Sequence, residues 1–262
     1  MSKELAWVIK KVIYEVKVWR IKLTMEYVGT AFNGFQVQPE KRTVEGEVEK
    51  SLSLILNQPI KIYASGRTDA GVHSLGQVAH FDIEEDMDVN FLQHELIKLL
   101  PEDITISEVS VAEPGFDSRF SVKKKTYVYK FYLSRFERAL YKNRALRVND
   151  NIEIEPMKEA CKYLIGIHDF TSFVARKSGK TDFVRTIYSA QIKETEEGLF
   201  EFEITGNGFL YNMVRIIMGT LIDVGAGRKS PSSVKTIIEG KNRALAGKTV
   251  LPHGLYMKRV EY

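Results

Sequence analysis

Residues 65–73 combine side chains that could do chemistry with glycines that let the backbone turn. They read Ser-Gly-Arg-Thr-Asp-Ala-Gly-Val-His, so the cation of Arg67 and the carboxylate of Asp69 are separated by one hydroxyl residue. Gly66 and Gly71 allow sharp turns on either side. An aspartate in such a turn often only bonds to its own backbone. The residues alone therefore allow a turn-forming aspartate or a nucleophilic one.

A second charged residue lies in a stretch that should be buried. Arg215 falls within residues 210–224, whose apolar composition predicts a helix. A guanidinium stays charged, so a buried one requires a carboxylate or phosphate partner. Asp69 is a candidate, and such a pair would lower the pKa of its carboxyl and keep it ionised as a nucleophile. Alternatively, Arg215 extends along the helix edge and reaches water.

Other candidate residues are weaker. His73 and His80 are seven residues apart, which is not the spacing of a helical metal pair, so we predict no metal site. Asp82 could be a second carboxylate for glycoside cleavage, but its charged, strand-like surroundings predict a solvated edge. Cys161 fits an apolar helix face and predicts core packing. The sequence has no phosphate-binding glycine loop and no dinucleotide fingerprint, so we predict no cofactor, nucleotides included.

These residues must be positioned by alternating strands and helices. The first half predicts helices after Thr43 and at 90–100, and strands at 17–28, 60–64, 77–83 and 104–111. The second half predicts helices from Pro156, at 210–224 and from Ser230, and strands at 127–133, 200–204 and 254–260. Many strands are neighbours without a helix between them, which favours a mixed or antiparallel sheet. We predict an α+β protein of two sheet-and-helix halves, 19–112 and 113–262. Periodicity does not show whether the two sheets are continuous.

The composition narrows the class of protein. With 262 residues, 44% hydrophobic and 27% charged, the chain is typical of globular proteins and unlike disordered or collagen-like ones. Its single cysteine excludes an internal disulfide framework and favours a reducing compartment. The sequence has no run of roughly 18 apolar residues and no signal-peptide pattern. We therefore predict a cytoplasmic protein without a membrane segment.

Positive charge is concentrated between Arg119 and Arg147. This segment contains ten basic residues against a single acid, Glu137. Aromatic residues are interleaved with them, among them Tyr127, Phe131, Tyr132, Phe136 and Tyr141. Most charge runs are solvated faces. An imbalance of this size, with aromatic rings among the cations, instead suits phosphate contacts and base stacking. The segment therefore favours a nucleic acid as the partner.

Residues 66–73 and 76–81 together resemble the signature of the TruA family of tRNA pseudouridine synthases. Further stretches that resemble motifs of this family follow in order over about residues 19–262: Tyr27 and Gly29, Gly34 and Gln36, 42–44, Phe116, Arg119 and Phe120, 125–129, 168–173, 185–187, 213–215 and 254–256. The resemblance implies a pseudouridine synthase fold, with two ferredoxin-like or RRM-like halves around a mixed, mainly antiparallel sheet. It also implies an isomerase that flips uridines 38, 39 and 40 out of the tRNA anticodon arm and converts them to pseudouridine, without cofactor or metal. Members of this family are homodimers, and one tRNA spans both subunits.

The resemblance also implies roles for individual residues. Asp69 would be the nucleophile, Arg215 its ion-pair partner, and Tyr127 the ring that stacks on the target base and helps remove its C5 proton. Arg67 would contact the RNA backbone or help displace the base, and Leu255 would form the apolar floor beneath it. The stretch with Arg119, Phe120 and Lys125 would bind RNA.

The chain departs from the family pattern at three positions. Val28 replaces a usual Asp, Phe35 a usual Trp, and Lys125 a frequent Arg. None of these is the expected nucleophile, so we expect an effect on tRNA affinity only. Residues 1–18 form an N-terminal extension beyond the usual start of the family, and we assign them no role.

Two other functions are compatible with parts of the sequence. A non-catalytic RNA-binding or RNA-chaperone protein would explain the basic segment but not the carboxylate within residues 66–71. A sugar hydrolase would need a second placed carboxylate and no basic segment.

Overall fold

The structure is a computed structural model, and it describes residues 18–84, 86–149, 151–175 and 182–262. The predicted N-terminal extension therefore lies outside the described residues except for Val18. None of the helices within the described ranges is long and apolar enough to cross a membrane.

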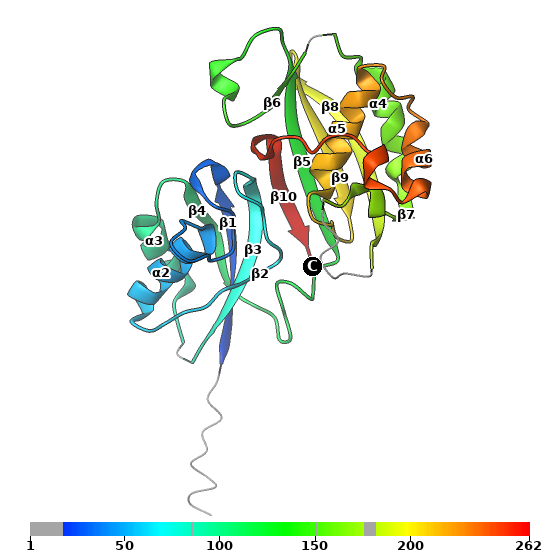
Figure 1. The fold of residues 1–262 in the computed structure, drawn as a ribbon. Helices are drawn as coiled ribbons and strands as arrows, with labels where there is room; N and C mark the ends of the chain where they lie inside the picture. Colours follow the sequence, from blue (N-terminus) through cyan, green and yellow to red (C-terminus); the bar gives the residue numbers. More distant parts are fainter. Residues whose placement is uncertain (1–17, 85, 150, 176–181) are drawn as a thin grey trace, which may run out of the picture.

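The N-terminal half is built around β1 (Trp19–Tyr27), whose side chains alternate between more and less buried positions. This alternation lets one face of the strand pack on the helices. β1 pairs antiparallel with β3 (His73–Ile83) and β4 (Ile104–Val111), and the two-residue β2 (Tyr63–Ala64) pairs with β3. Figure 1 shows the two helices of this half beside these strands: α2 (Val44–Leu56) and α3 (Val89–Leu99).

The C-terminal half contains six strands and three α-helices among the described residues. The strands are β5 (Lys124–Leu133), β6 (Leu146–Val148), β7 (Gly166–Asp169), β8 (Val184–Glu196), β9 (Leu199–Gly206) and β10 (Leu255–Glu261). The helices are α4 (Ile154–Cys161), α5 (Met213–Gly225) and α6 (Ser233–Gly240), and they lie together beside this part of the sheet (Figure 1).

The two halves share one sheet, in the order β4-β1-β3-β10-β5-β9-β8-β7. The last strand, β10, joins them because it pairs antiparallel with β5 and parallel with β3. The parallel contact is only two residues long, Tyr256 opposite His73 and Met257 opposite Ser74. Within the described residues, β5 with β6 is the other parallel pair. The prediction of an α+β protein with a mixed, mainly antiparallel sheet is confirmed.

Two large hydrophobic clusters form the cores of the halves. One contains side chains from Ile21 to Val109, and the other contains side chains from β5 to β10 together with Val72. Cys161 is buried in the second cluster, as predicted. A domain boundary between residues 112 and 113 stays a prediction.

The sequence prediction missed one long strand, β8. Its buried positions are few, and its end (Glu194–Glu196) is exposed and largely charged, so alternation of apolar residues is weak there. The short β6 and β7 were also not predicted. The predicted strand at 60–64 is wrong in its extent: Ile60 and Ile62 are buried in the core, and pairing begins only at Tyr63.

The helix α5 and the segment after it bring the end of the chain back to the sheet. A Cβ atom on Gly219 would lie 1.8 Å from the carbonyl oxygen of Lys248, and one on Gly247 would lie 2.5 Å from the carbonyl carbon of Gly219. Only glycine allows the backbones to approach this closely. Residues 247–254 are thereby held against α5 and lead directly into β10.

Candidate active site

The 65–72 loop, residues 65–72 between β2 and β3, carries Asp69 and is supported from the N-terminal half. The backbone N–H of Phe35 donates to the Thr68 carbonyl at 3.0 Å. Gly34 has φ +90°, and a Cβ atom there would lie 2.9 Å from the same carbonyl oxygen. The Thr68 hydroxyl lies 2.8 Å from the buried Tyr27 hydroxyl. These contacts fix the backbone on the N-terminal side of Asp69.

The start of the loop is fixed by a second set of contacts. The Ser65 hydroxyl donates to Gln77 Oε1 at 2.6 Å, and Gln77 Nε2 donates to the Gly66 carbonyl at 2.8 Å. Lys125 Nζ donates to the Ser65 carbonyl at 2.5 Å. Burial, with a smaller contribution from the positive charge of Arg119, lowers the pKa of Lys125 to about 8. Lys125 therefore points at the loop backbone rather than outward to solvent.

Asp69 faces the guanidinium of Arg215 across the junction of the halves. Arg215 Nη1 lies 3.5 Å from Asp69 Oδ2, and the exposed fractions of the two side chains are 15% and 33%. Arg215 is oriented by the Val250 carbonyl at 2.8 Å from Nε and by Asn212 Oδ1 at 2.7 Å from Nη1. The geometry therefore agrees with an Arg215 that is paired with Asp69, and not with one that extends along the helix edge into water.

The expected pKa of Asp69 needs correction. Burial raises the pKa of its carboxyl above the ordinary value, and the charge and hydrogen bond of Arg215 only partly oppose this. Our sequence-based expectation of a lowered pKa was wrong because it counted the cation and omitted desolvation. Arg215 therefore favours the ionised form of Asp69 against the effect of burial.

Tyr127 lies on β5 with its ring edge-on to Phe209, at a centroid distance of 5.1 Å. Burial raises the pKa of its hydroxyl, and the charges of Tyr27 and Asp69 raise it further. The hydroxyl is therefore a neutral donor at pH 7. It makes no hydrogen bond to any residue within the described ranges, so it is available to a ligand.

Leu255, at the first position of β10, is 7% exposed and lies in the same hydrophobic cluster as Val72. Tyr127 packs against this cluster. The C-terminal half thus places Leu255 and the Tyr127 ring in the cluster that also contains Val72, the last residue of the 65–72 loop.

Three of the predicted RNA-binding residues point away from this cluster. Arg67 is exposed. Arg119 and Phe120 follow a turn in which both backbone N–H groups bond to Asp117, and the Phe120 side chain is 82% exposed. The Arg119 guanidinium lies 5.5 Å from the centre of the Phe120 ring. The structure therefore leaves these side chains available at the surface.

The basic segment is not one uniform track. Three of its cations are paired with acids: Lys124 with Glu261, Lys130 with Glu201, and Arg147 with Glu137. Glu201 and Glu261 lie on β9 and β10, so the sequence of the segment alone could not show that they pair with its lysines.

The alternative candidates have other partners. His73 accepts the Gly29 N–H at Nδ1 and stacks on Tyr256, and burial lowers the pKa of its imidazole to about 4. Asp82 is paired with Arg20 at 2.7 Å, and its side chain is 38% exposed. No group of three potential metal ligands was found among the residues that the structure describes.

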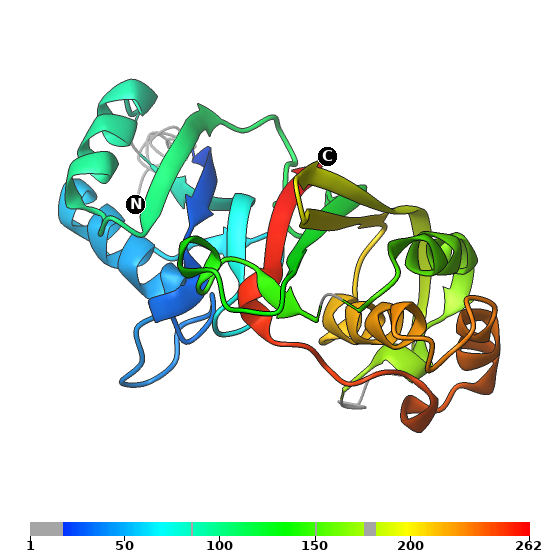
Figure 2. The ribbon, with the colours of Figure 1, turned by 90° about the horizontal axis from the view of Figure 1, so that it is seen from above.

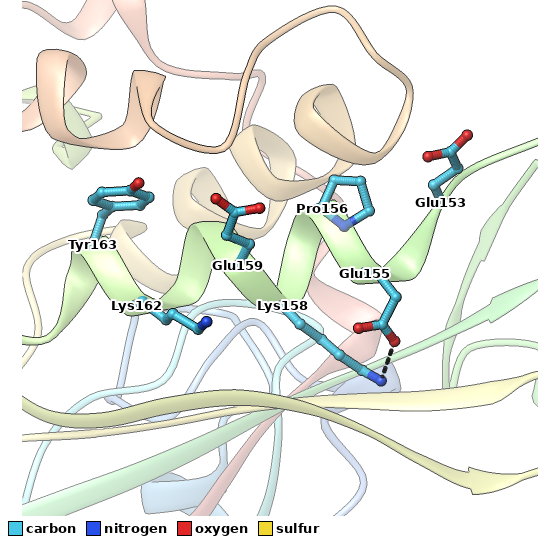
Figure 3. Close-up of a pocket in the computed structure, with 7 residues that line it drawn as sticks. All are labelled: Glu153, Glu155, Pro156, Lys158, Glu159, Lys162 and Tyr163. Carbon is cyan, nitrogen blue, oxygen red and sulfur yellow. Dashed lines mark hydrogen bonds and ion pairs between the residues drawn. The ribbon is translucent and has the colours of Figure 1, made fainter.

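A surface hollow lies elsewhere, along α4 (Figure 3). Its lining contains none of the predicted site residues: it is formed by Glu153, Glu155, Pro156, Lys158, Glu159, Lys162 and Tyr163. Lys158 and Glu155 are paired there at 2.7 Å. The hollow has no residue set for the chemistry considered above.

Known proteins define the family of the chain. A family model described as tRNA pseudouridine synthase matches residues 23–121 and 160–262. The tRNA pseudouridine synthase A of Bacillus subtilis (strain 168) is 46% identical over 245 residues, which cover 93% of this chain and 99% of that protein. The protein of the same name from Anoxybacillus flavithermus is 46% identical over 244 residues, covering 93% and 98%. The chain belongs to the tRNA pseudouridine synthase family, and it is an isomerase of that class.

Similarity to solved structures adds little to this family assignment. One of a Cbf5-Nop10-Gar1 complex aligns with 77% of this chain and 54% of that chain, at 14% identity and a TM-score of 0.31. This similarity is too low to carry an argument. The family match leaves out residues 122–159, so it does not reach Tyr127 or Lys125.

Sequence reasoning did not assign roles to several supporting residues. Tyr27 and Gln77 were noted only as parts of motifs, although both bind the 65–72 loop, and Asn212 was not considered although it orients Arg215. The polar residues within β3 could have indicated these supporting contacts. Buried polar side chains need partners, and the nearby loop supplies them.

Proposed function

We propose that this protein converts uridine to pseudouridine in the anticodon arm of tRNA, at positions 38, 39 and 40, with Asp69 as the nucleophile. The proposal rests on one observation: a carboxylate on a tightly supported loop lies 3.5 Å from a guanidinium that is itself fixed by two further hydrogen bonds. Preorganised charge of this kind favours an ionised nucleophile at a site that excludes much water.

The reaction breaks one bond to the ribose and makes another. The glycosidic bond from C1′ to N1 breaks, the base turns, and C5 bonds to C1′. N1 gains a proton and C5 loses one, so the reaction is balanced without a redox partner. Asp69 attacks either the ribose or the uracil ring, and both routes require its ionised form.

The remaining site residues would receive the flipped base. A base leaving its stack loses stacking energy, and the Tyr127 ring can replace that stacking. The raised pKa of Tyr127 keeps its hydroxyl protonated, which suits hydrogen bonding to the uracil better than removal of the C5 proton by this residue alone. Leu255 would contact the apolar face of the base, and Arg67 would contact the RNA beside Asp69.

The substrate would be held mainly through its phosphates. Arg119 and the exposed Phe120 offer a cation and a stacking surface. Lys125 is an exception, because its ammonium is bonded to the protein backbone. We further propose a homodimer acting in the cytoplasm, with one tRNA contacting both subunits.

The experiment is tritium release from tRNA labelled at uracil C5, comparing the parent with Asp69→Ala and Asp69→Asn. Each turnover must discharge the C5 hydrogen, so release reports chemistry rather than binding. We expect release by the parent and at least about a thousandfold slower release by both variants, since the nucleophile is lost. A tRNA-binding measurement on each variant serves as the control.

The other outcomes are equally informative. If the parent binds tRNA but releases no tritium, the protein is an RNA-binding protein on this substrate and the proposed activity is wrong. If the variants release tritium like the parent, the reaction stands but Asp69 is not its nucleophile.

A further inference from the structure

The connection between β5 and β6, residues 134–145 (the 134–145 loop), is built as an ordered projection. It has its own small hydrophobic cluster of Tyr132, Ala145 and Leu199, against which Tyr141 packs. The Tyr132 hydroxyl donates to Glu137 at 2.8 Å, and the Tyr141 hydroxyl donates to Glu196 at 3.1 Å. The loop is therefore fixed from its inner side.

Its outer side presents large apolar side chains to solvent. Phe136 is 73% exposed and Leu140 is 88% exposed. The Arg135 guanidinium lies 5.8 Å from the centre of the Phe136 ring, and the Arg138 guanidinium lies 4.4 Å from that of Tyr141. Exposed apolar side chains gathered on an ordered element commonly mark an interaction site.

The charge of the loop is strongly positive. Arg135, Arg138, Lys142 and Arg144 form no ion pair with any residue in the part of the chain that the structure describes. The one acid of the loop, Glu137, is already engaged by Arg147 at 2.9 Å. Four cations without an acidic partner, next to the exposed Phe136 ring and the exposed Leu140, match a polyanion that also has flat faces, which describes RNA.

The loop is attached next to the site. The Tyr256 hydroxyl donates to the Arg144 carbonyl at 2.8 Å, and the Tyr256 ring stacks on His73 at a centroid distance of 4.6 Å. His73 directly follows the 65–72 loop. The figures show the 134–145 loop projecting beyond the end of β5, near the junction of the two halves (Figures 1 and 2).

We propose that the 134–145 loop is an RNA-contacting element, in which Phe136 and Leu140 pack against unstacked nucleotides beside the target uridine while its four cations bind the neighbouring phosphates. This inference rests on the proposed function, because it takes tRNA as the bound polyanion. It goes beyond the family match, which stops at residue 121 and resumes at residue 160.

A second copy of the chain is the competing occupant. In a two-fold symmetric contact each copy presents the same surface, and a loop near the axis meets the same loop of the other copy. Two such loops would bring eight unpaired cations together, and that repulsion disfavours the arrangement. RNA offers phosphates to the four cations and base faces to Phe136 and Leu140.

The test measures the affinity for an unmodified tRNA transcript, the single-turnover tritium release, and the sedimentation mass of each variant. Phe136→Ala should weaken binding by about 5-fold to 100-fold, since a base stacked on an aromatic ring contributes roughly that much, and Phe136→Trp should keep the parent affinity. Leu140→Ala removes an apolar contact only and should weaken binding by a smaller factor. Arg135→Gln and Arg138→Gln should each reduce the slope of log affinity against log salt by about 0.7 to 0.9.

Phe91→Ala is the matched control, because Phe91 is a 52% exposed aromatic residue on α3, outside the site and the basic segment. Its affinity should equal that of the parent. The side chains changed are exposed, so thermal unfolding should be the same in all variants.

The inference is wrong if Phe136→Ala and Leu140→Ala bind tRNA like the parent while the parent releases tritium. It is also wrong if these variants change the sedimentation mass while the affinity per subunit is unchanged, which would make the loop a contact between copies. A parent that neither binds tRNA nor releases tritium refutes the proposed function instead, and the two failures are thus distinguishable.

Discussion

Two connections between strands flank the stacked pair of His73 and Tyr256, and they are held by different parts of the sheet. The 65–72 loop is tied by side chains from three strands: Tyr27 of β1, Gln77 of β3 and Lys125 of β5. The 134–145 loop is tied to strands of the C-terminal half. Tyr132 of β5 and Arg147 of β6 donate to its Glu137, its Tyr141 donates to Glu196 of β8, and Tyr256 of β10 donates to the Arg144 carbonyl. The first loop is thus held by strands of both halves, whereas these hydrogen bonds hold the second loop to strands of the C-terminal half.

This difference fits two kinds of task. A nucleophile must be held within a fraction of an ångström of its productive position, so its loop needs support from several elements. A surface that receives a flexible polymer needs exposed rings and cations rather than a fixed position across the sheet. The predictions below test whether chemistry and RNA binding separate along these lines.

The largest effect is expected at Arg215. Arg215→Met removes the cation that opposes the effect of burial on Asp69, so the pKa of the Asp69 carboxyl should rise further. The nucleophile is the ionised form, which is lost as the pH falls through this pKa. The acid limb of the single-turnover pH profile should therefore move to higher pH, and the rate at pH 7 should drop by about 100-fold or more.

The conservative variant Arg215→Lys is its control. It keeps a positive charge but cannot reproduce the two hydrogen bonds that fix the guanidinium, to Val250 and Asn212. We expect an acid limb close to that of the parent with a lowered plateau. An unshifted acid limb in Arg215→Met would show that Arg215 does not control the charge of Asp69.

Tyr27 and Tyr132 allow the two loops to be compared directly, because each tyrosine hydroxyl forms a hydrogen bond to one of them. Tyr27→Phe removes the hydrogen bond to Thr68, and the buried threonine hydroxyl then loses its partner. We expect turnover to fall about tenfold with tRNA affinity unchanged. Tyr132→Phe removes the bond to Glu137 and should weaken tRNA binding by a few fold with the rate of bound substrate unchanged.

Both variants lose one hydroxyl from a tyrosine that is 3% exposed or less, so their stabilities should fall similarly. Urea unfolding measures that loss and separates it from function. If both variants lose turnover and affinity in the same proportion, the two loops do not have separate tasks.

The loop with Asp69 and the helix with Arg215 could be found from the sequence, because their residue types are unusual for their surroundings. A charged residue in an apolar helix predicts a partner, and glycines around a carboxylate predict a tight turn. The 3.5 Å contact between Asp69 and Arg215 could only be a hypothesis, since 146 positions of chain separate them.

Other features depend on the register of the sheet. Tyr256 lies opposite His73 in a parallel contact of two residue pairs, and no local pattern encodes so short a pairing. Lys125 belongs to a run of three lysines, and only the fold shows that one of them turns inward. The pKa of Asp69 was predicted in the wrong direction because burial is a property of the whole molecule.

The smallest effect is expected at Lys125, and it concerns stability. Burial lowers the pKa of Lys125 to about 8, below the ordinary value of 10.5. Between these two values the unfolded chain binds a proton that the folded protein does not, so the free energy of unfolding contributed by this residue rises with pH. From pH 7 to pH 9 the parent should gain about 1 kcal/mol relative to Lys125→Met. Urea unfolding at both pH values measures this difference, and Lys124→Met, which changes the exposed neighbouring lysine, should follow the parent. Equal pH dependence in the parent and Lys125→Met would mean that the ammonium of Lys125 is as well solvated in the folded protein as in the unfolded chain, and the 65–72 loop would then lack one of its three ties.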